Sequence, residues 1–258
     1  MINYEKISQQ SFLGYIWIMV TQFVSLIGSM IVSFAVIWYL TIETGSTLIL
    51  STAAIANIVP MIIVSPIAGV IADRMNKNVM LIITDLMQAL STLVLIILFS
   101  LGINQLWHII ALLVVRGLCQ GFQMPIAVAI TSLMVPEDKI KPINSINQIF
   151  NSLLGIASPA IGAIAIANFN IQQIYWLDVF TFIPTAIILL LIRIPSVTKK
   201  ISSNSEEKGS SFKQEFKEGF SYIKTSGLSS IFAMFAIANF IVVPVFALFP
   251  LLILNHHG

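Results

Sequence analysis

The sequence has 258 residues, of which 57% are hydrophobic and only 9% are charged. Soluble domains carry roughly a quarter charged residues, so this chain has too few polar side chains to cover the surface of a soluble protein of its length. The net charge of +2 gives no argument for a nucleic-acid partner, and a single cysteine, Cys119, excludes a disulfide framework and a multi-thiolate metal site. We therefore expect membrane lipid to surround most of the chain.

Apolar stretches long enough to cross the membrane recur along the whole chain. A helix needs roughly 20 mainly apolar residues to cross the hydrocarbon core, and the stretches that qualify are 13–40, 48–71, 79–101, 106–133, 143–168, 174–194 and 228–254. The first is longer than the apolar region of a signal peptide and has no small-residue cleavage pattern after it, so we expect it to remain as a span. The sequence thus predicts an all-α, polytopic membrane protein.

Basic residues occur in alternate connections between these spans. Lys or Arg residues precede the first span and follow the second, fourth and sixth, whereas the connections near 41–47, 102–105 and 169–173 contain none. All but one of the 13 basic residues therefore lie on one side, the exception being Arg116. Cytoplasmic loops carry the excess of Lys and Arg. We expect a multi-pass protein of the cell membrane with its N-terminus in the cytoplasm.

A long polar segment divides the chain. We predict a six-helix transmembrane domain at 1–194, a cytoplasmic linker at 195–227 and the start of a second transmembrane domain at 228–258. Within the linker, Phe212, Phe216 and Phe220 recur at helical spacing, which predicts an amphipathic helix on the membrane surface or packed against the protein. Because a single span follows the linker, we interpret the chain as truncated, or as one part of an assembly with a separate C-terminal half.

The sequence contains no nucleophile–base motif, no P-loop and no zinc-binding pattern, so we expect no enzymatic activity, no cofactor and no metal.

The sequence does contain a charged cluster between the second and third spans, formed by Gly69, Asp73, Arg74 and Lys77. Ser65 and Gly69 are four residues apart, and we expect them to let a neighbouring helix approach closely. The alternative is an ordinary short charged loop.

This cluster resembles the loop signature of the major facilitator superfamily, G-x-x-x-D-R-x-G-R-R in its usual form. It matches at the four residues just named. It departs at Asn76, where the family usually has glycine, and at Asn78, where a second basic residue is common. The resemblance implies two six-helix bundles that rock about a central substrate site, with this loop forming a charge contact between the halves that helps to control opening.

Other parts of the chain are similar to one branch of the superfamily, the drug:proton antiporters that include macrolide efflux proteins. The similar stretches include Gln22 to Ser29, Asp85-Leu86, Arg116, Ser158-Pro159 and Leu248 to Leu251. The resemblance implies that protons moving inward are exchanged for small hydrophobic compounds moving outward, with macrolides as the first expected substrate class. Export of a siderophore or metabolite by the same fold is one alternative, and an inactive truncated fragment or membrane scaffold is another.

Three charged residues inside the spans are candidates for proton coupling. Burying Arg116 costs at least ~2.5–3.5 kcal/mol on insertion scales, so it should face a cavity or a partner. It either takes part in coupling or forms a structural pair with a carboxylate. Asp178 either carries the proton or caps a helix contact near the outer surface. We expect Asp85 to be structural, tied to the charge cluster at the inner boundary.

Polar and aromatic side chains inside the spans are candidates to line a substrate cavity, with helix packing as the alternative for each. They are Gln22, Phe34, Asn57, Gln120, Gln123 and Phe150. Gly117 and Gly121 form a G-x-x-x-G pair, for which we expect close helix packing.

Overall fold

The computed structural model describes residues 4–103, 105–192, 194, 229, 230, 234, 237 and 238, and gives the backbone alone for residues 4–10, 73 and 74. The helices of these ranges are α1 (Tyr4–Thr44), α2 (Thr47–Arg74), α3 (Lys77–Ser100), α4 (Leu106–Met134), α5 (Glu137–Asn168) and α6 (Ile171–Leu191). All six are long and apolar enough to cross a membrane, which confirms the first six predicted spans. The predicted linker helix lies outside the described residues, as does most of the predicted seventh span.

Most of the helices begin before the predicted spans, because turns outside the apolar stretches continue them. The clearest case is α5, which begins at Glu137 rather than at 143. Glu137 and Asp138 occupy its first turn, where negative charge interacts favourably with the N-terminal end of the helix dipole. Apolar length therefore locates a span but underestimates its helix.

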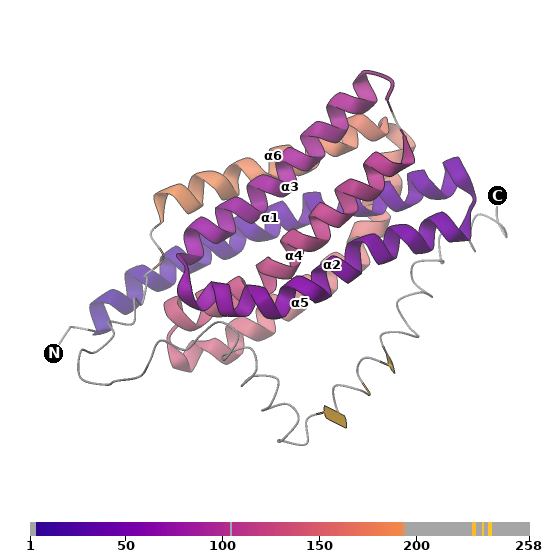
Figure 1. Ribbon diagram of the computed structural model, residues 1–258. Coiled ribbons are helices and arrows are strands. Elements are labelled where there is room, and N and C mark those ends of the chain that lie inside the picture. The colour runs from indigo at the N-terminus through magenta and orange to yellow at the C-terminus, as the bar shows by residue number, and fades with distance from the viewer. Residues whose placement is uncertain are drawn as a thin grey trace.

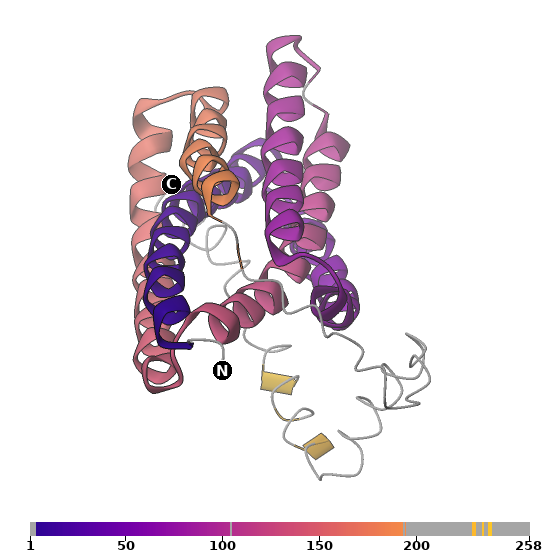
Figure 2. The ribbon, with the colours of Figure 1, turned by 90° about the vertical axis from the view of Figure 1, so that its left-hand side faces the viewer.

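The six helices run side by side, with successive connections at alternate ends of the bundle (Figure 1). Figure 2 shows α1, α5 and α6 together on one side and α2, α3 and α4 on the other. Within these groups α1 packs against α5 and α6, and α4 packs against α2 and α3. Contact between α3 and α6 joins the two groups.

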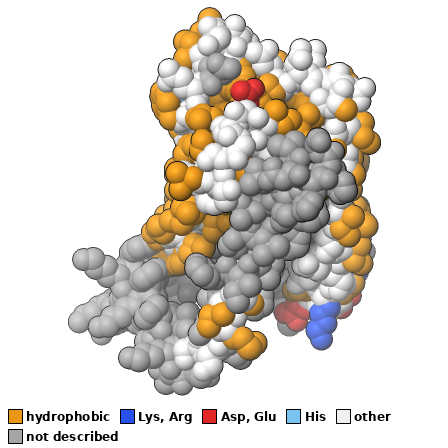
Figure 3. Space-filling view, turned by 90° about the vertical axis from the view of Figure 1, so that its right-hand side faces the viewer, with side chains coloured by type: hydrophobic (Ala, Val, Ile, Leu, Met, Phe, Trp, Pro, Cys, Tyr) orange, Lys and Arg blue, Asp and Glu red, His pale blue; other side chains and the backbone are white. Residues whose placement is uncertain are grey.

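The described surface is mostly apolar. Figure 3 shows hydrophobic side chains over much of it, with only a few charged side chains. Large apolar side chains such as Ile62, Val128, Ile156 and Leu190 are each at least 60% exposed. Water would not accommodate so much exposed apolar surface on a monomeric soluble protein, whereas lipid does.

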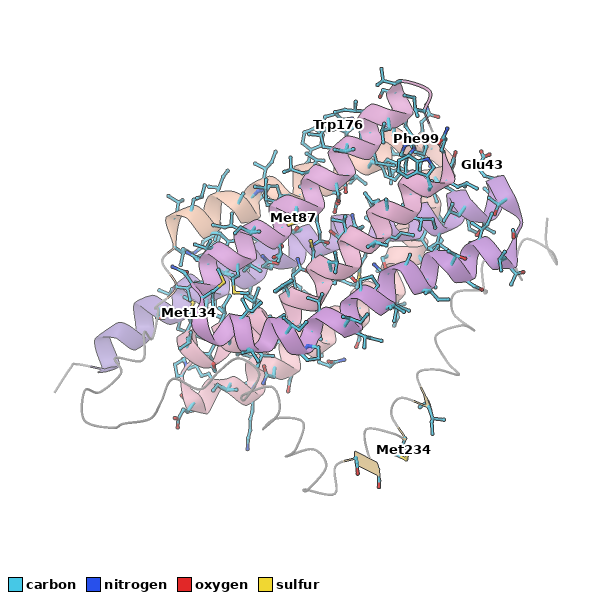
Figure 4. The ribbon with its side chains drawn as sticks, viewed as in Figure 1. Glu43, Met87, Phe99, Met134, Trp176 and Met234 are labelled. Carbon is cyan, nitrogen blue, oxygen red and sulfur yellow. The ribbon has the colours of Figure 1, made fainter. Side chains whose placement is uncertain are left out.

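We call the end of the bundle that holds Tyr4 and the α2–α3 and α4–α5 connections the inner end, and the opposite end the outer end. Figure 4 shows Met134 at the inner end, Glu43 and Phe99 at the outer end, and Met87 between them. The basic residues Lys77, Lys139 and Lys141 lie in the first turns of α3 and α5, next to the two inner connections. The charge pattern of the sequence thus maps onto one end of the fold.

Two apolar clusters fill the bundle, one toward each end. The outer cluster includes Val36, Phe99 and Ile109, and the inner cluster includes Tyr15 and Ile130. Between them in sequence lie the polar segments of α1, α3 and α4, with few apolar core residues. The fold therefore encloses a polar layer at membrane depth, where unpaired polar groups are costly.

Candidate functional site

Polar side chains recur every seven residues on three helices of the bundle. The pairs are Gln22 and Ser29 on α1, Asp85 and Thr92 on α3, and Arg116 and Gln123 on α4. Seven residues are close to two helical turns, so each pair shares a helix face with its members about 10 Å apart along the axis. Because α4 runs opposite to α1 and α3, the pairs form two layers. We call them the outer layer (Ser29, Thr92 and Arg116) and the inner layer (Gln22, Asp85 and Gln123).

The outer layer surrounds an ion pair between α4 and α6. Arg116 Nη1 lies 2.7 Å from Asp178 Oδ2, and the two side chains are 1% and 4% exposed. The Thr92 hydroxyl donates to the same carboxylate oxygen at 2.7 Å, and the Ser29 hydroxyl donates to Asp178 Oδ1 at 2.6 Å. Arg116 Nη2 donates to the Ser29 carbonyl oxygen at 3.1 Å. The Asp178 carboxylate thus has a countercharge and two hydroxyl donors, and four helices meet at it.

This geometry settles where Arg116 points. Its guanidinium faces a carboxylate partner, as expected from the high free-energy cost of an unpaired charge at membrane depth. Asp178 is part of this pair and not a separate contact at the outer surface. Neither Ser29 nor Thr92 was predicted as a partner of Asp178. Their only signal is the seven-residue spacing from Gln22 and Asp85.

The inner layer holds the second buried carboxylate. Asp85 is 4% exposed. Its Oδ2 accepts a hydrogen bond from Gln22 Nε2 at 2.8 Å, and its Oδ1 accepts one from Gln123 Nε2 at 2.7 Å. Among the described side chains, Asp85 thus binds amides of α1 and α4, and its expected tie to the charge cluster of the inner boundary stays a prediction, because the side chains of Asp73 and Arg74 lie outside the described residues. The structure brings together three candidates that are far apart in sequence.

Residues 18–258 match the family described as the Major Facilitator Superfamily. The chain belongs to the major facilitator superfamily. It is a multi-pass membrane protein with the all-helical architecture of that superfamily. The resemblance carried by the loop between α2 and α3 is thereby confirmed.

The relatives include efflux proteins. Macrolide efflux protein A of Streptococcus pyogenes is 30% identical over 236 residues, which are 91% of this chain and 57% of that protein. Macrolide efflux protein A of Enterococcus faecalis is 27% identical over 213 residues, 82% of this chain and 64% of that protein. The uncharacterized MFS-type transporter YfiS of Bacillus subtilis is 22% identical over 212 residues, 82% of this chain and 49% of that protein. The chain thus spans about half to two thirds of each. No solved structure matches.

The superfamily loop forms its turn without glycine. Asn76 is the N-cap of α3, with a φ of −68° in the extended region, and its side chain accepts a hydrogen bond from the Asn78 backbone N–H at 3.0 Å. A left-handed residue is therefore not needed at this position. The side chains of Asp73 and Arg74 lie outside the described residues, so their predicted charge contact stays a prediction. Lys77 is buried in the first turn of α3.

Asn78 has a specific partner where superfamily members commonly have a second basic residue. Its Nδ2 donates to the carbonyl oxygens of Leu189, at 3.1 Å, and Ile192, at 2.7 Å. Carbonyl groups at a helix C-terminus have no partner within the helix. Asn78 therefore caps the inner end of α6 and ties it to the superfamily loop.

A groove of about 470 Å³ lies between α2 and α4 toward the inner end. It is lined by Ser65, Gly69, Ala72, Met124, Pro125, Val128, Ala129 and Ser132. A Cβ built on Gly69 meets nothing within 4 Å, so within the described bundle the expected close approach of a helix at Gly69 is wrong.

The expected close packing at the G-x-x-x-G pair of Gly117 and Gly121 is confirmed. A Cβ on Gly121 would lie 2.8 Å from the Met61 carbonyl oxygen, and one on Gly117 would collide with the Asn57 backbone.

The remaining cavity candidates have separate environments. Asn57 Nδ2 donates to the Leu113 carbonyl oxygen at 3.3 Å, which joins α2 to α4. Phe34 stacks on Trp38 of its own helix, with ring centroids 6.1 Å apart. The other two are Phe150, 43% exposed and stacked on Phe23, and Gln120, half-buried on α4 between the two layers. Their role as cavity residues stays a prediction.

Proposed function

We propose that this chain forms part of a secondary transporter that exports small hydrophobic compounds from the cytoplasm in exchange for protons. Membership of the superfamily supports transport rather than enzymatic catalysis. The relatives named macrolide efflux protein A support efflux, with macrolides as the first substrate class. The protein acts in the cell membrane with its N-terminus in the cytoplasm, a proposal supported by the basic connections at the inner end.

The observation that carries the proton-coupled mechanism is the buried Arg116–Asp178 pair. Charged groups at membrane depth are expensive and mark ion pathways and proton relays. Replacing a buried ion pair by apolar residues is often neutral or stabilising, so stability alone does not account for it. A role in coupling explains why charge is placed between two apolar clusters.

The pair also offers a physical route from charge to conformation. Hydrogen bonds from α1, α3 and α4 meet at one carboxylate of α6. A proton that changes the charge balance among these helices changes which arrangement of the bundle is favoured. A ligand shifts a conformational equilibrium only through such differential interactions. The proton gradient supplies the driving force, and the cycle needs no cofactor.

The test is the accumulation of a radiolabelled macrolide in host cells that lack their own macrolide exporter. Cells that express the full chain are expected to accumulate less macrolide than cells with an empty vector, and a protonophore should abolish the difference. Arg116→Ala, present in the membrane fraction at the same level, should also abolish it. Glu43→Gln is the matched control, because Glu43 is an exposed carboxylate at the outer end.

Three other outcomes discriminate between alternatives. Reduced accumulation of a siderophore, with unchanged macrolide, would assign the chain to siderophore export by the same fold. Unchanged accumulation of every compound would contradict transport by this chain and favour a scaffold or an inactive fragment. Undiminished macrolide exclusion in Arg116→Ala would remove Arg116 from the coupling mechanism while leaving efflux in place.

A further inference from the structure

The two carboxylates buried in the described bundle differ in how their charge is compensated. Asp178 has the Arg116 guanidinium at 2.7 Å and two hydroxyl donors. Asp85 is equally buried, but its partners are the neutral amides of Gln22 and Gln123. Among the residues that the structure describes, Asp85 has no ion pair. One site therefore holds a balanced charge and the other an unbalanced one.

We propose that Asp85 is the residue that takes up and releases the coupling proton, while Asp178 stays ionised and holds Arg116 in place. This inference rests on the proposed proton antiport and names the residue that performs it. The step is simple in chemical terms. A proton from the aqueous phase binds one carboxylate oxygen of Asp85 to give a neutral carboxylic acid, and the same proton later leaves to the opposite side.

The surroundings of Asp85 disfavour a permanent negative charge on its carboxyl group in addition to the one on Asp178. An isolated ionised carboxylate in an apolar environment is strongly unfavourable and tends to become neutral. On the elements packed around it, α4 contributes Arg116 and the Cys119 thiol, α6 contributes Asp178, and α1 contributes the neutral Gln22. Arg116 is already paired, and the negative charge of Asp178 repels a negative charge at Asp85.

Glutamine is well suited to hold a carboxyl group in both protonation states. An ionised carboxylate only accepts hydrogen bonds, whereas a protonated one also donates through its O–H. Each glutamine amide carries two N–H donors and one carbonyl acceptor. The observed bonds from Gln22 and Gln123 serve the ionised state, and rotation of one amide by half a turn would present its carbonyl oxygen to the O–H of the protonated state. Both oxygens of the Asp85 carboxyl group would thus keep a hydrogen-bond partner in either state.

The seven-residue spacing links this site to the outer layer. Asp85 shares a face of α3 with Thr92, and Gln123 shares a face of α4 with Arg116. Protonation of Asp85 rearranges its bonds to α1 and α4, the helices that also supply Ser29 and Arg116 to the Asp178 pair. A change in the inner layer therefore acts on the outer layer through two rigid turns of helix.

Protonation can be measured directly by pH-difference infrared spectroscopy of the purified full chain in lipid vesicles, without substrate. We expect a carboxylic acid C=O band that appears on acidification at a frequency distinct from the bands of exposed carboxyl groups bonded to water. The band should be lost in Asp85→Asn and kept in Asp178→Asn and in the exposed control Glu43→Gln. Asp85→Glu should keep the band at a shifted position, and it decides the question if Asp85→Asn fails to fold. A band that survives Asp85→Asn, or that stays unshifted in Asp85→Glu, overturns the proposal.

Flux measurements separate this inference from the proposed function. If the wild-type chain moves no macrolide but its infrared band belongs to Asp85, the antiport proposal fails and the proton site stands. If the wild-type chain exchanges macrolide for protons, Asp85→Asn should still equilibrate macrolide across the vesicle but lose proton movement and uphill transport. Proton movement that persists with macrolide in Asp85→Asn assigns the coupling proton elsewhere.

Discussion

Arg116 and Gln123 lie seven residues apart on α4, and each donates a hydrogen bond of 2.7 Å to a different buried carboxylate. One helix thus positions both carboxylates that are buried in the described bundle, one through a charge and the other through an amide. Because two helical turns separate the donors, the two carboxylates contact α4 at different depths in the bundle. A displacement of α4 would therefore alter both sites together, as the proposed proton-coupled transport requires.

Breaking the Arg116–Asp178 pair by replacing one residue is expected to destabilise the protein more than replacing both residues. Arg116→Met or Asp178→Leu alone leaves a buried charge unpaired, which costs about 3–5 kcal/mol, whereas the double variant should recover most of that loss. Cys119, the sole cysteine, is buried, so a thiol-reactive fluorogenic dye reports thermal unfolding of the purified protein without an added label. Single variants that unfold at the wild-type temperature would contradict the prediction.

The close contact between α2 and α4 gives a second prediction. Gly117→Ala places a Cβ against the Asn57 backbone, and overpacking of this kind typically costs about 1–3 kcal/mol. Gly69→Ala is the matched control, because the same methyl group meets open space there and removal of a helical glycine contributes roughly 0.5–1 kcal/mol of stability. The dye assay should show a lower unfolding temperature for the first variant and an unchanged or higher one for the second. Equal effects at both glycines would show that the helices do not approach at Gly117.

The sequence was sufficient for the spans because apolar length is a local property. It was also sufficient to place Arg116 against a partner, since an unpaired charge at membrane depth is too costly. It could not tell which partner. Asp178 lies 62 residues away in sequence, and Gln22 lies 63 residues from Asp85. Periodicity fixes the face of a helix but not the neighbour that the face meets.

The errors have the same origin. Ser65 and Gly69 fit a small-residue packing motif, yet they line a groove, because small residues permit both close contact and open space. Thr92 was missed because a hydroxyl in an apolar helix commonly bonds to its own backbone, as Thr92 also does to the Gln88 carbonyl oxygen at 3.1 Å. Only the layered arrangement of three helices reveals its second role at Asp178.

Asn78 is expected to stabilise the junction between the superfamily loop and α6. Asn78→Ala removes both hydrogen bonds to the inner end of α6 and should cost roughly 1–3 kcal/mol, because two carbonyl groups lose their partner. Asn168→Ala is a suitable control, since among the described residues the exposed Asn168 side chain bonds within its own helix, to the Ile164 carbonyl oxygen. Comparable thermal unfolding of the two variants would argue against the capping role.

The orientation of the bundle can be tested with single cysteines in a Cys119→Ala background. Glu43→Cys lies at the outer end and Lys139→Cys at the inner end, and both positions are exposed. Since basic connections remain in the cytoplasm, a membrane-impermeant maleimide should label Glu43→Cys in intact cells and Lys139→Cys only after permeabilisation. The reverse pattern would invert the topology. It would also place the groove between α2 and α4 and the Asp85 site closer to the external face, contrary to the proposed orientation.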